Sequence, residues 1–406
     1  MRVLAVPESD DLLQNRLFDP PAERNRDNCM EPFRYLRESL AAKGVQIDTF
    51  DMGDPAEADR IIFFELKRFT PLFQNLEVTR PEQRVLVIWE PPAVCPINYD
   101  RDIHSLFGAV LTWNDDLVDG GKYRKLHYPV PRYPRRESVP FAERKMLCTI
   151  ISNKASRHRD SLYSERIRAI RFFERRCPDQ FDFFGAGWGK PTTKWQRLRL
   201  ARVPRFTSYR GPVDSKQETL ARYRFALCYE NMRTRNGFIT EKIFDAMQAG
   251  TVPVYLGAEN VTDYIRPDAF IDARRFSDYE QLFQHLTEMS EQQHQGYLER
   301  IAAYLDSEDF AQFLPERFAE RILDALTRLA EGPLPSAAAE AAGRRKVEAR
   351  YLAEESRRIF DTGDRKGFRR MFHRLTWLDP RRALTSYGLV ARYAASLVGI
   401  RRTRRA

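Results

Sequence analysis

The sequence lacks several features that would place it in other classes of protein. None of its 406 residues lies in an uninterrupted apolar run of roughly 18, the length that a transmembrane helix needs. Its five cysteines are scattered, odd in number and without a CxxC pair, so neither a disulfide framework nor structural zinc is expected. The amino terminus lacks the apolar run and small-residue cleavage site of a signal peptide, which predicts a cytoplasmic protein.

Positive charge is concentrated at the carboxyl end of the chain. The formal net charge is +10, but residues 341–406 hold 18 Lys or Arg against 6 Asp or Glu, a local +12. The remaining 340 residues therefore sum to −2. Because the basic charge belongs to the tail, any acidic partner that it implies is a partner of the tail.

Short apolar runs alternate with amphipathic stretches in two successive sets. Continuous apolar runs between helices are typical of parallel sheets covered on both faces, so the sequence predicts an α/β protein with two Rossmann-like domains facing a cleft. We predict an N-terminal domain over 1–130, a proline-rich interdomain linker over 131–145, and a second domain over 146–333 whose last helices can pack back on the first. A basic, amphipathic helical tail is expected over 334–406.

The most informative stretch is residues 225–257, which has the pattern strand, loop, helix, strand. Thr240 occupies an N-cap position and Gly250 the position where the helix should end. Glu241 and Lys242 then lie in the first helical turn, where free amide groups and the helix dipole make a natural diphosphate site. The alternative interpretation is a capped surface helix with an ordinary Glu-Lys pair.

The order of residues in this stretch resembles the signature of glycosyltransferase family 10, the α-1,3/α-1,4-fucosyltransferases. The matching positions are Glu230, Asn231, Phe238, Thr240, Glu241, Lys242, Gly250, Thr251, Pro253 and Gly257. The resemblance implies a GT-B fold and inverting transfer of L-fucose from GDP-β-L-fucose to a hydroxyl of a glycan acceptor. Without an N-terminal membrane anchor the chain is similar to the bacterial branch, which implies an α-1,3 linkage on LPS or another surface polysaccharide.

Two further segments resemble the family outside this block. In Ile150–Arg159, the Ser-Asn pair ending at Asn153 and the later Arg159 correspond to donor-binding residues, with Arg159 implied as a diphosphate ligand. Arg157 lies at an ambiguous spacing, and both arginines could simply be solvated at a helix start. Glu90, at the end of an apolar strand, corresponds to the proposed general base; Pro91 departs from the family's Ser, and the alternative role for Glu90 is that of a turn residue.

The resemblance also implies where the nucleoside binds and what the site does not need. Tyr229, Glu230, Asn231 and Phe238 are expected around the guanosine, while Trp188 could flank the donor or be a packed turn aromatic. No cofactor or divalent metal is predicted, because cationic side chains can neutralise the leaving diphosphate, the histidines lack ligand spacing, and no Asp-x-Asp element stands in a donor-site context. The adjacent pair Asp115-Asp116 is interpreted as solvated.

The expected partners are GDP-fucose, a glycan acceptor and, through the tail, an anionic membrane surface at the inner face of the cytoplasmic membrane. A solvated or oligomerising helix and a nucleic-acid patch are the other interpretations of the tail; the body of the chain gives no sign of nucleic-acid binding. Two alternatives to the function stay open. One is a GT-B enzyme with a different nucleotide-sugar donor, and the other is a non-catalytic nucleotide- or glycan-binding module.

Overall fold

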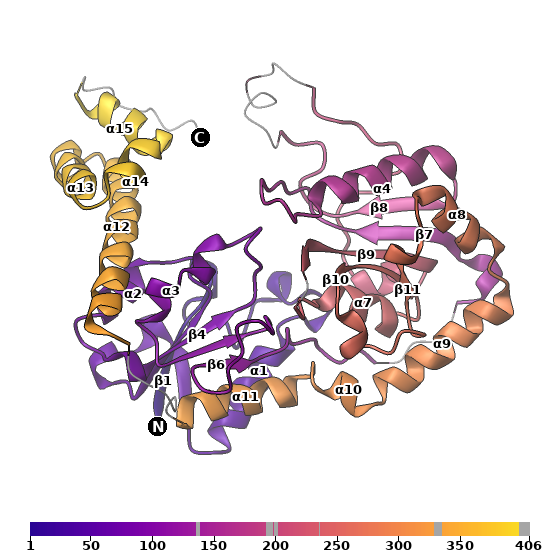
Figure 1. The fold of residues 1–406 in the computed structure, drawn as a ribbon, viewed down its shortest axis with the longest axis horizontal. Helices are drawn as coiled ribbons and strands as arrows, with labels where there is room; N and C mark the ends of the chain where they lie inside the picture. The colour runs from indigo at the N-terminus through magenta and orange to yellow at the C-terminus, as the bar shows by residue number, and fades with distance from the viewer. Residues whose placement is uncertain (135–138, 192–197, 199–201, 235, 329–334, 398–406) are drawn as a thin grey trace.

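The computed structural model contains two parallel sheets covered by helices, followed by a helical extension (Figure 1). It describes residues 1–134, 139–191, 198, 202–234, 236–328 and 335–397, with only the backbone of residues 234 and 387. Within these ranges, no helix is both long and apolar enough to cross a membrane.

The first sheet has six parallel strands in the order β2-β1-β3-β4-β5-β6. They are β1 (Arg2–Val6), β2 (Gln46–Thr49), β3 (Arg60–Phe64), β4 (Arg84–Ile88), β5 (Ala109–Thr112) and β6 (Tyr123–Lys125). The central strand β4 is buried along its whole length, as expected for a strand with helices on both faces. These strands confirm the apolar runs as the source of a Rossmann-like first domain.

The second sheet has five parallel strands in the order β11-β10-β9-β7-β8. They are β7 (Lys145–Ile150), β8 (Phe181–Phe184), β9 (Tyr223–Thr234), β10 (Val252–Ala258) and β11 (Ile271–Asp272). Read from its other edge, this sheet repeats the order of the first five strands of sheet one. In this order the second strand lies on one side of the first, and the third and later strands lie on its other side. Ligands of such sheets bind at the carboxyl ends of the strands, beside the point where the strand order reverses.

Helices cover each sheet in separate groups. The first domain carries α1 (Glu31–Ala41), α2 (Thr70–Asn75) and α3 (Arg101–His104); the second carries α4 (Tyr163–Arg176), α6 (Lys216–Leu220), α7 (Glu241–Gln248), α8 (Tyr279–Glu288), α9 (Glu291–Leu305) and α10 (Glu308–Ala311). Helix α7 packs against β9 and β10, so its start is fixed by the centre of the second sheet.

Helix α11 (Pro315–Thr327) returns to the first domain and packs against α1. Phe318 and Ile322 are buried in the same apolar cluster as residues of β1, β3 and β4. In packing terms, α11 therefore belongs to the first domain, whereas the sequence assigned residues 146–333 to the second. The sequence predicted that the last helices of the second domain would pack back on the first, and α11 does so.

The extension begins with α12 (Ala337–Thr362), which packs on α2 and α3 of the first domain. Figure 1 shows α12 rising from that domain and carrying α13 (Arg365–Leu378), α14 (Pro380–Thr385) and α15 (Tyr387–Leu397) away from both sheets. These helices share their own small core, which includes Leu352, Phe368 and Leu389. The tail is thus a packed helical subdomain, anchored on the first domain at one end.

Candidate functional site

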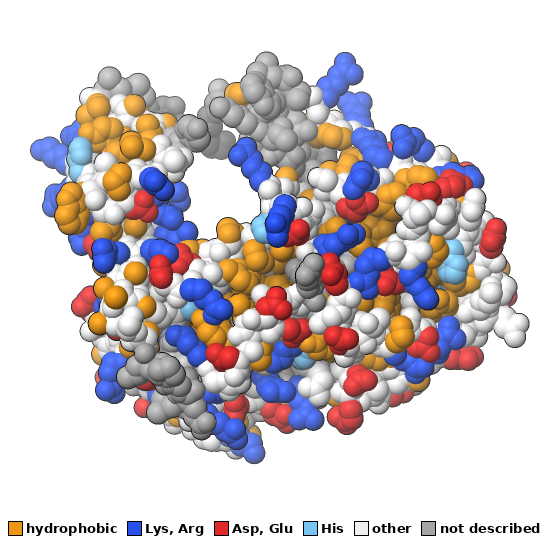
Figure 2. Space-filling model, viewed as in Figure 1, with side chains coloured by type: hydrophobic (Ala, Val, Ile, Leu, Met, Phe, Trp, Pro, Cys, Tyr) orange, Lys and Arg blue, Asp and Glu red, His pale blue; other side chains and the backbone are white. Residues whose placement is uncertain are grey.

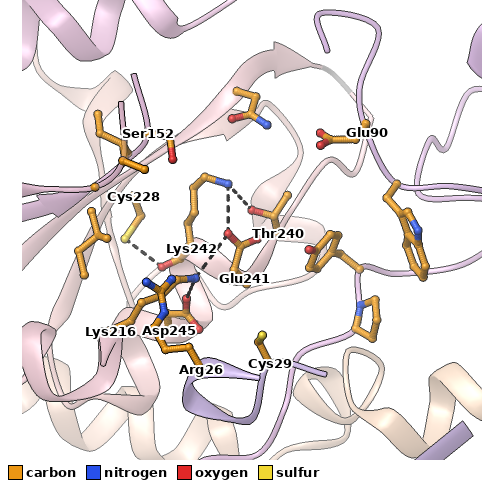
Figure 3. Close-up of a pocket in the computed structure, with 18 of the residues that line it drawn as sticks. Arg26, Cys29, Glu90, Ser152, Lys216, Cys228, Thr240, Glu241, Lys242 and Asp245 are labelled. Carbon is orange, nitrogen blue, oxygen red and sulfur yellow. Dashed lines mark hydrogen bonds and ion pairs between the residues drawn. The ribbon is translucent and has the colours of Figure 1, made fainter. Parts of the chain in front are cut away.

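A cavity of about 470 Å³ lies between the two domains and is lined by both. Its walls come from the carboxyl ends of the strands: Glu8 after β1, Glu90 after β4, Ser152 after β7 and Asn231 within the last part of β9. This is where the reversal of strand order places a ligand site in each sheet. Figure 3 shows Glu90 on the first-domain side, facing Lys242 and Thr240 on the second-domain side.

The start of α7 is held by the carboxylate of Glu230, which is completely buried on β9. Glu230 accepts hydrogen bonds from the backbone N–H and the hydroxyl of Thr240, both at 2.9 Å, and from the ammonium of Lys242 at 3.1 Å. Thr240 occupies the N-cap position as predicted, but its hydroxyl is bound to Glu230 and does not cap the helix. Gly250 follows the helix with φ +69°, as predicted for its end.

Gly257 on β10 makes room for this buried carboxylate. A Cβ added at Gly257 would lie 2.6 Å from Cγ of Glu230 and 2.4 Å from the hydroxyl of Tyr255. Glu230 itself does not line the cavity, so it supports the site from beneath rather than contacting a ligand.

Lys242 presents its ammonium to the cavity from the first turn of α7. Burial lowers the pKa of Lys242, but the carboxylates of Glu230 and Glu241 outweigh this effect and raise it above the usual value. The side chain is therefore charged at neutral pH. A fixed cation beside free amide groups at a helix N-terminus is an arrangement that binds phosphate.

A cluster of three charged side chains lies beside Lys242, around Asp245, which is one turn further along α7. Lys216 on α6 pairs with Asp245 at 2.7 Å and with Glu241 at 3.8 Å, and all three line the cavity. Burial raises the pKa of Glu241, but Lys242 and Lys216 together lower it below its usual value, so Glu241 is ionised and can accept hydrogen bonds from hydroxyl groups. The sequence interpretation missed Asp245 and Lys216; the signal for Asp245 was its position four residues after Glu241 on the same helical face.

Arg166 on α4 lines the cavity, as does Arg26 of the first domain, whereas Arg159 does not. Only 5% of Arg166 is exposed, and its guanidinium donates to the carbonyl of Tyr229 and, at 3.0 Å, to the side chain of Asn231. The side chain of Arg159 is 91% exposed and pairs with Asp160 at 3.3 Å. The structure thus does not bring Arg159 to the cavity, because the segment before α4 directs it to solvent.

Some of the other residues predicted to bind the donor line the cavity, and some do not. Asn231, Phe238, Thr240, Glu241 and Lys242 line the cavity. Asn153 and Tyr229 do not: the Asn153 amide donates to the carbonyl of Gly187, and Tyr229 is buried in the core of the second domain. Trp188 is likewise a packed turn residue, whose indole N–H donates to the carbonyl of Ile151 at 2.8 Å.

Asp115 was interpreted as solvated, and this is wrong. Its carboxylate bridges the domains: it pairs with Lys125 of the first domain and accepts hydrogen bonds from Tyr264, at 2.7 Å, and Asn260, at 3.0 Å, of the second. Burial raises its pKa, but these partners together lower it. Next to this cluster, Trp113 of the first domain packs on Phe238 with ring centroids 4.8 Å apart, which ties the loop before α7 to the first domain.

Glu90 provides a carboxylate with 24% of its side chain exposed, opposite the cationic side of the cavity. Burial raises its pKa, and Lys67, at 3.9 Å, together with Lys154 and Lys242 opposes the rise. A carboxylate with a raised pKa is a better proton acceptor at neutral pH than an exposed one. The arrangement can therefore remove a proton on one side of the cavity and stabilise negative charge on the other.

Among the residues that the structure describes, no group of three or more His, Cys, Asp or Glu is arranged to hold a metal ion.

Comparison with known proteins identifies relatives of part of this chain. Residues 142–300 match the model described as glycosyltransferase family 10 (fucosyltransferase), C-terminal part. The chain is 28% identical over 204 residues to alpha-(1,3)-fucosyltransferase 7 of Rattus norvegicus, which covers 48% of this chain and 45% of the rat protein. It is 34% identical over 74 residues to alpha-(1,3)-fucosyltransferase FucT of Helicobacter pylori, which covers 18% and 15%. The chain thus matches less than half of the length of these curated relatives.

Solved structures support the fold across both domains. A crystal structure of an alpha1,3-fucosyltransferase is similar with a TM-score of 0.52 and 14% identity, covering 81% of this chain and 90% of the other. The DNA-modifying enzyme beta-glucosyltransferase is similar with a TM-score of 0.50 and 11% identity, covering 81% of this chain and 100% of the other. With its two parallel-sheet domains, the chain has the GT-B fold.

Proposed function

We propose, from the premise that this chain belongs to glycosyltransferase family 10 through residues 142–300, that it transfers L-fucose from GDP-β-L-fucose to a glycan hydroxyl. The observation that carries the proposal is the opposition of Glu90 to Lys242 and the N-terminus of α7 across one interdomain cavity. A transfer with inversion needs a base on the acceptor side and stabilisation of a leaving group on the donor side.

In the proposed reaction, the carboxylate of Glu90 takes the proton of the acceptor hydroxyl. The hydroxyl oxygen forms a bond to the anomeric carbon of fucose from the face opposite to GDP, and the bond between that carbon and the β-phosphate oxygen breaks with its electron pair. Lys242, the amide groups of α7 and Arg166 stabilise the charge that develops on GDP. After the transfer, the acceptor carries fucose, GDP leaves as an anion, and the carboxyl of Glu90 holds the proton.

The same charges support donor binding without a divalent metal. Lys154, Arg166, Lys216 and Lys242 line the cavity, and Glu241 is available for ribose or sugar hydroxyls. Fixed cations can replace the metal that neutralises diphosphate in other transferases. We accordingly propose that binding of GDP-fucose persists in EDTA.

On the acceptor side, the first-domain wall supports a sugar substrate. Phe33, Trp89 and Tyr128 line the cavity near Glu90, and aromatic side chains with a few polar groups are typical of sites that bind the apolar faces of ligands. We propose a glycan of a bacterial surface polysaccharide or LPS as acceptor, joined through an α-1,3 linkage.

The donor half of the proposal is tested by calorimetric titration in EDTA with GDP, GDP-fucose, GDP-mannose and UDP-galactose. We expect GDP and GDP-fucose to bind and to raise the melting temperature. Binding of UDP-galactose alone would instead favour a different donor, and binding without turnover a non-catalytic module. For the chemistry, Glu90→Gln should bind GDP-fucose with unchanged affinity yet lose at least a hundredfold in kcat; unchanged kcat would refute the role of Glu90.

We further propose that the tail docks on an anionic membrane at the cytoplasmic face. Trp377 is 85% exposed, Leu384 63% and Leu397 61%, and Figure 2 shows hydrophobic and basic side chains side by side on this part of the molecule. Exposed apolar side chains among arginines are typical of surfaces that bind the lipid interface.

Vesicle co-sedimentation tests this docking. The double variant Trp377→Ser, Leu384→Ser should lose binding to vesicles of phosphatidylglycerol and phosphatidylcholine, and Met52→Ser, an equally apolar change at an exposed position of the first domain, should not. Equal binding of the double variant, or no preference of the native chain for phosphatidylglycerol, would refute the proposal.

A further inference from the structure

Glu65 combines two unusual features at the carboxyl end of β3. Its backbone has φ +71°, in the left-handed region that residues with side chains rarely adopt. Its side chain is an ionisable group with only 2% of the residue exposed. Strained backbone and buried charge persist only when their surroundings hold them in place, and both are enriched at functional sites.

The carboxylate of Glu65 is bound to the turn that carries Glu90. One oxygen, Oε1, accepts the backbone N–H of Trp89 and, at 2.8 Å, the backbone N–H of Glu90. The other oxygen, Oε2, accepts from the side-chain amide of Asn98. Glu65 therefore fixes the first two residues after β4, immediately where the side chain of Glu90 turns toward the cavity.

Asn98 makes this network specific for a carboxylate. While its amide nitrogen donates to Glu65, its amide oxygen accepts the backbone N–H of Leu66 at 2.9 Å. A glutamine at position 65 would present an NH₂ group to the NH₂ group of Asn98, and rotation of Asn98 to accept from it would leave the N–H of Leu66 without its acceptor. A neutral side chain of the same size therefore cannot reproduce the network.

Burying the ionised carboxylate of Glu65 costs free energy, and a contact with a purely structural role would not require a charged group. Burial raises the pKa of Glu65 to about 7, against the hydrogen bonds from the turn and the charge of Lys67, which lower it. Apolar packing could close this turn without a buried ion.

We propose that Glu65 is a positioning residue for Glu90, whose carboxylate it aims at the acceptor hydroxyl by holding the N–H groups of Trp89 and Glu90. The inference rests on the proposed function. It assigns no contact with substrate to Glu65, since that residue does not line the cavity.

The test is a double-mutant cycle on the full chain, measured by transfer from GDP-fucose. Glu65→Gln should lower kcat at least tenfold in the native background, with KM for GDP-fucose and Kd for GDP changed less than twofold. In the Glu90→Gln background the same substitution should change kcat less than twofold, because Glu65 acts only through Glu90.

Glu354→Gln is the matched control. The Glu354 carboxylate also accepts two consecutive backbone N–H groups, those of Phe69 and Thr70, in the connection that follows Glu65, but it touches neither Trp89 nor Glu90. Its kcat should stay within twofold of native. An equal loss of kcat in Glu65→Gln and Glu354→Gln would show that only the rigidity of the segment after β3 matters, and would overturn the proposal.

Other outcomes also decide the question. Native kcat in Glu65→Gln, an equal loss of kcat in both backgrounds, or a parallel loss of GDP affinity would overturn the positioning role. If Glu65→Gln does not fold, Asn98→Ala, which removes one partner of Glu65, should show a smaller loss of kcat with GDP affinity kept; an unchanged kcat there would overturn it. If the native chain neither transfers nor hydrolyses fucose from GDP-fucose, the proposed function itself fails, and this result is distinct from any outcome of the cycle.

Discussion

Glu65→Gln should change how stability depends on pH, separately from any effect on activity. The folded-state pKa of Glu65, about 7, lies above its usual value of 4.5. Between these values the folded state holds a proton on Glu65 that the unfolded chain releases. Stability is thus highest below pH 4.5 and is lost as pH rises toward 7. Glutamine cannot titrate, so the variant lacks this loss.

The size of the effect follows from the same two values. At 1.36 kcal/mol per pH unit, the difference costs the native protein about 3 kcal/mol at pH 8 relative to pH 4.5. The backbone N–H of Glu90 and the ammonium of Lys67 lower the pKa of Glu65, while Cys95 and Tyr99 stay neutral because burial raises the pKa of both. All four are present in both proteins, so their titration largely cancels in the comparison.

The assay is thermal unfolding of native protein and Glu65→Gln from pH 4.5 to 8, followed by near-UV circular dichroism. Loss of hydrogen bonds gives the variant a constant deficit in stability, but the difference should move in its favour by about 3 kcal/mol as pH rises, on the order of 3–4 °C in melting temperature for a chain of 406 residues. Parallel pH profiles would refute the reasoning, since they would mean that Glu65 has the same pKa in both states. A difference that moves against the variant as pH rises would mean that folding lowers the pKa of Glu65, and would contradict the sign of the predicted shift.

Three further predictions test the site. Lys242→Met should weaken GDP binding in calorimetry by about 2 kcal/mol, roughly 30-fold, because a charge-assisted contact with the diphosphate is lost; unchanged affinity would place the diphosphate elsewhere. Gly257→Ala should lower stability by about 1–3 kcal/mol in thermal unfolding, since its Cβ meets Glu230, and a melting temperature equal to native would contradict the close approach. Asp115→Ala should lower stability by about 1–3 kcal/mol, because the ammonium of Lys125 loses its carboxylate partner; Asp116→Ala, at the neighbouring position, should leave stability unchanged.

The sequence predicted the elements whose signals are local. Continuous apolar runs identified the strands other than β6 and β11, which carry no such run, and Thr240 and Gly250 marked both ends of α7, because the sequence signals for the ends of a helix lie within one turn. What it missed depends on contacts between distant residues. Asp115 finds Tyr264 149 residues away, and the choice of Arg166 over Arg159 depends on which face α4 turns to β9. Glu65 gave only a weak signal, a charged residue after an apolar strand, because its partners Trp89, Glu90 and Asn98 lie in the connection between the next two strands, β4 and β5.

The return of α11 to the first domain has a consequence for the order in which the protein folds. The buried residues of α11, Phe318 and Ile322 among them, complete a core whose other members are made within the first 126 residues, so that core stays open while the ribosome adds the whole second domain. The second sheet, closed by helices that end at residue 311, can finish first. We expect the part of the chain that is synthesised first to be the part that closes last, and to expose its apolar surface to chaperones in the meantime.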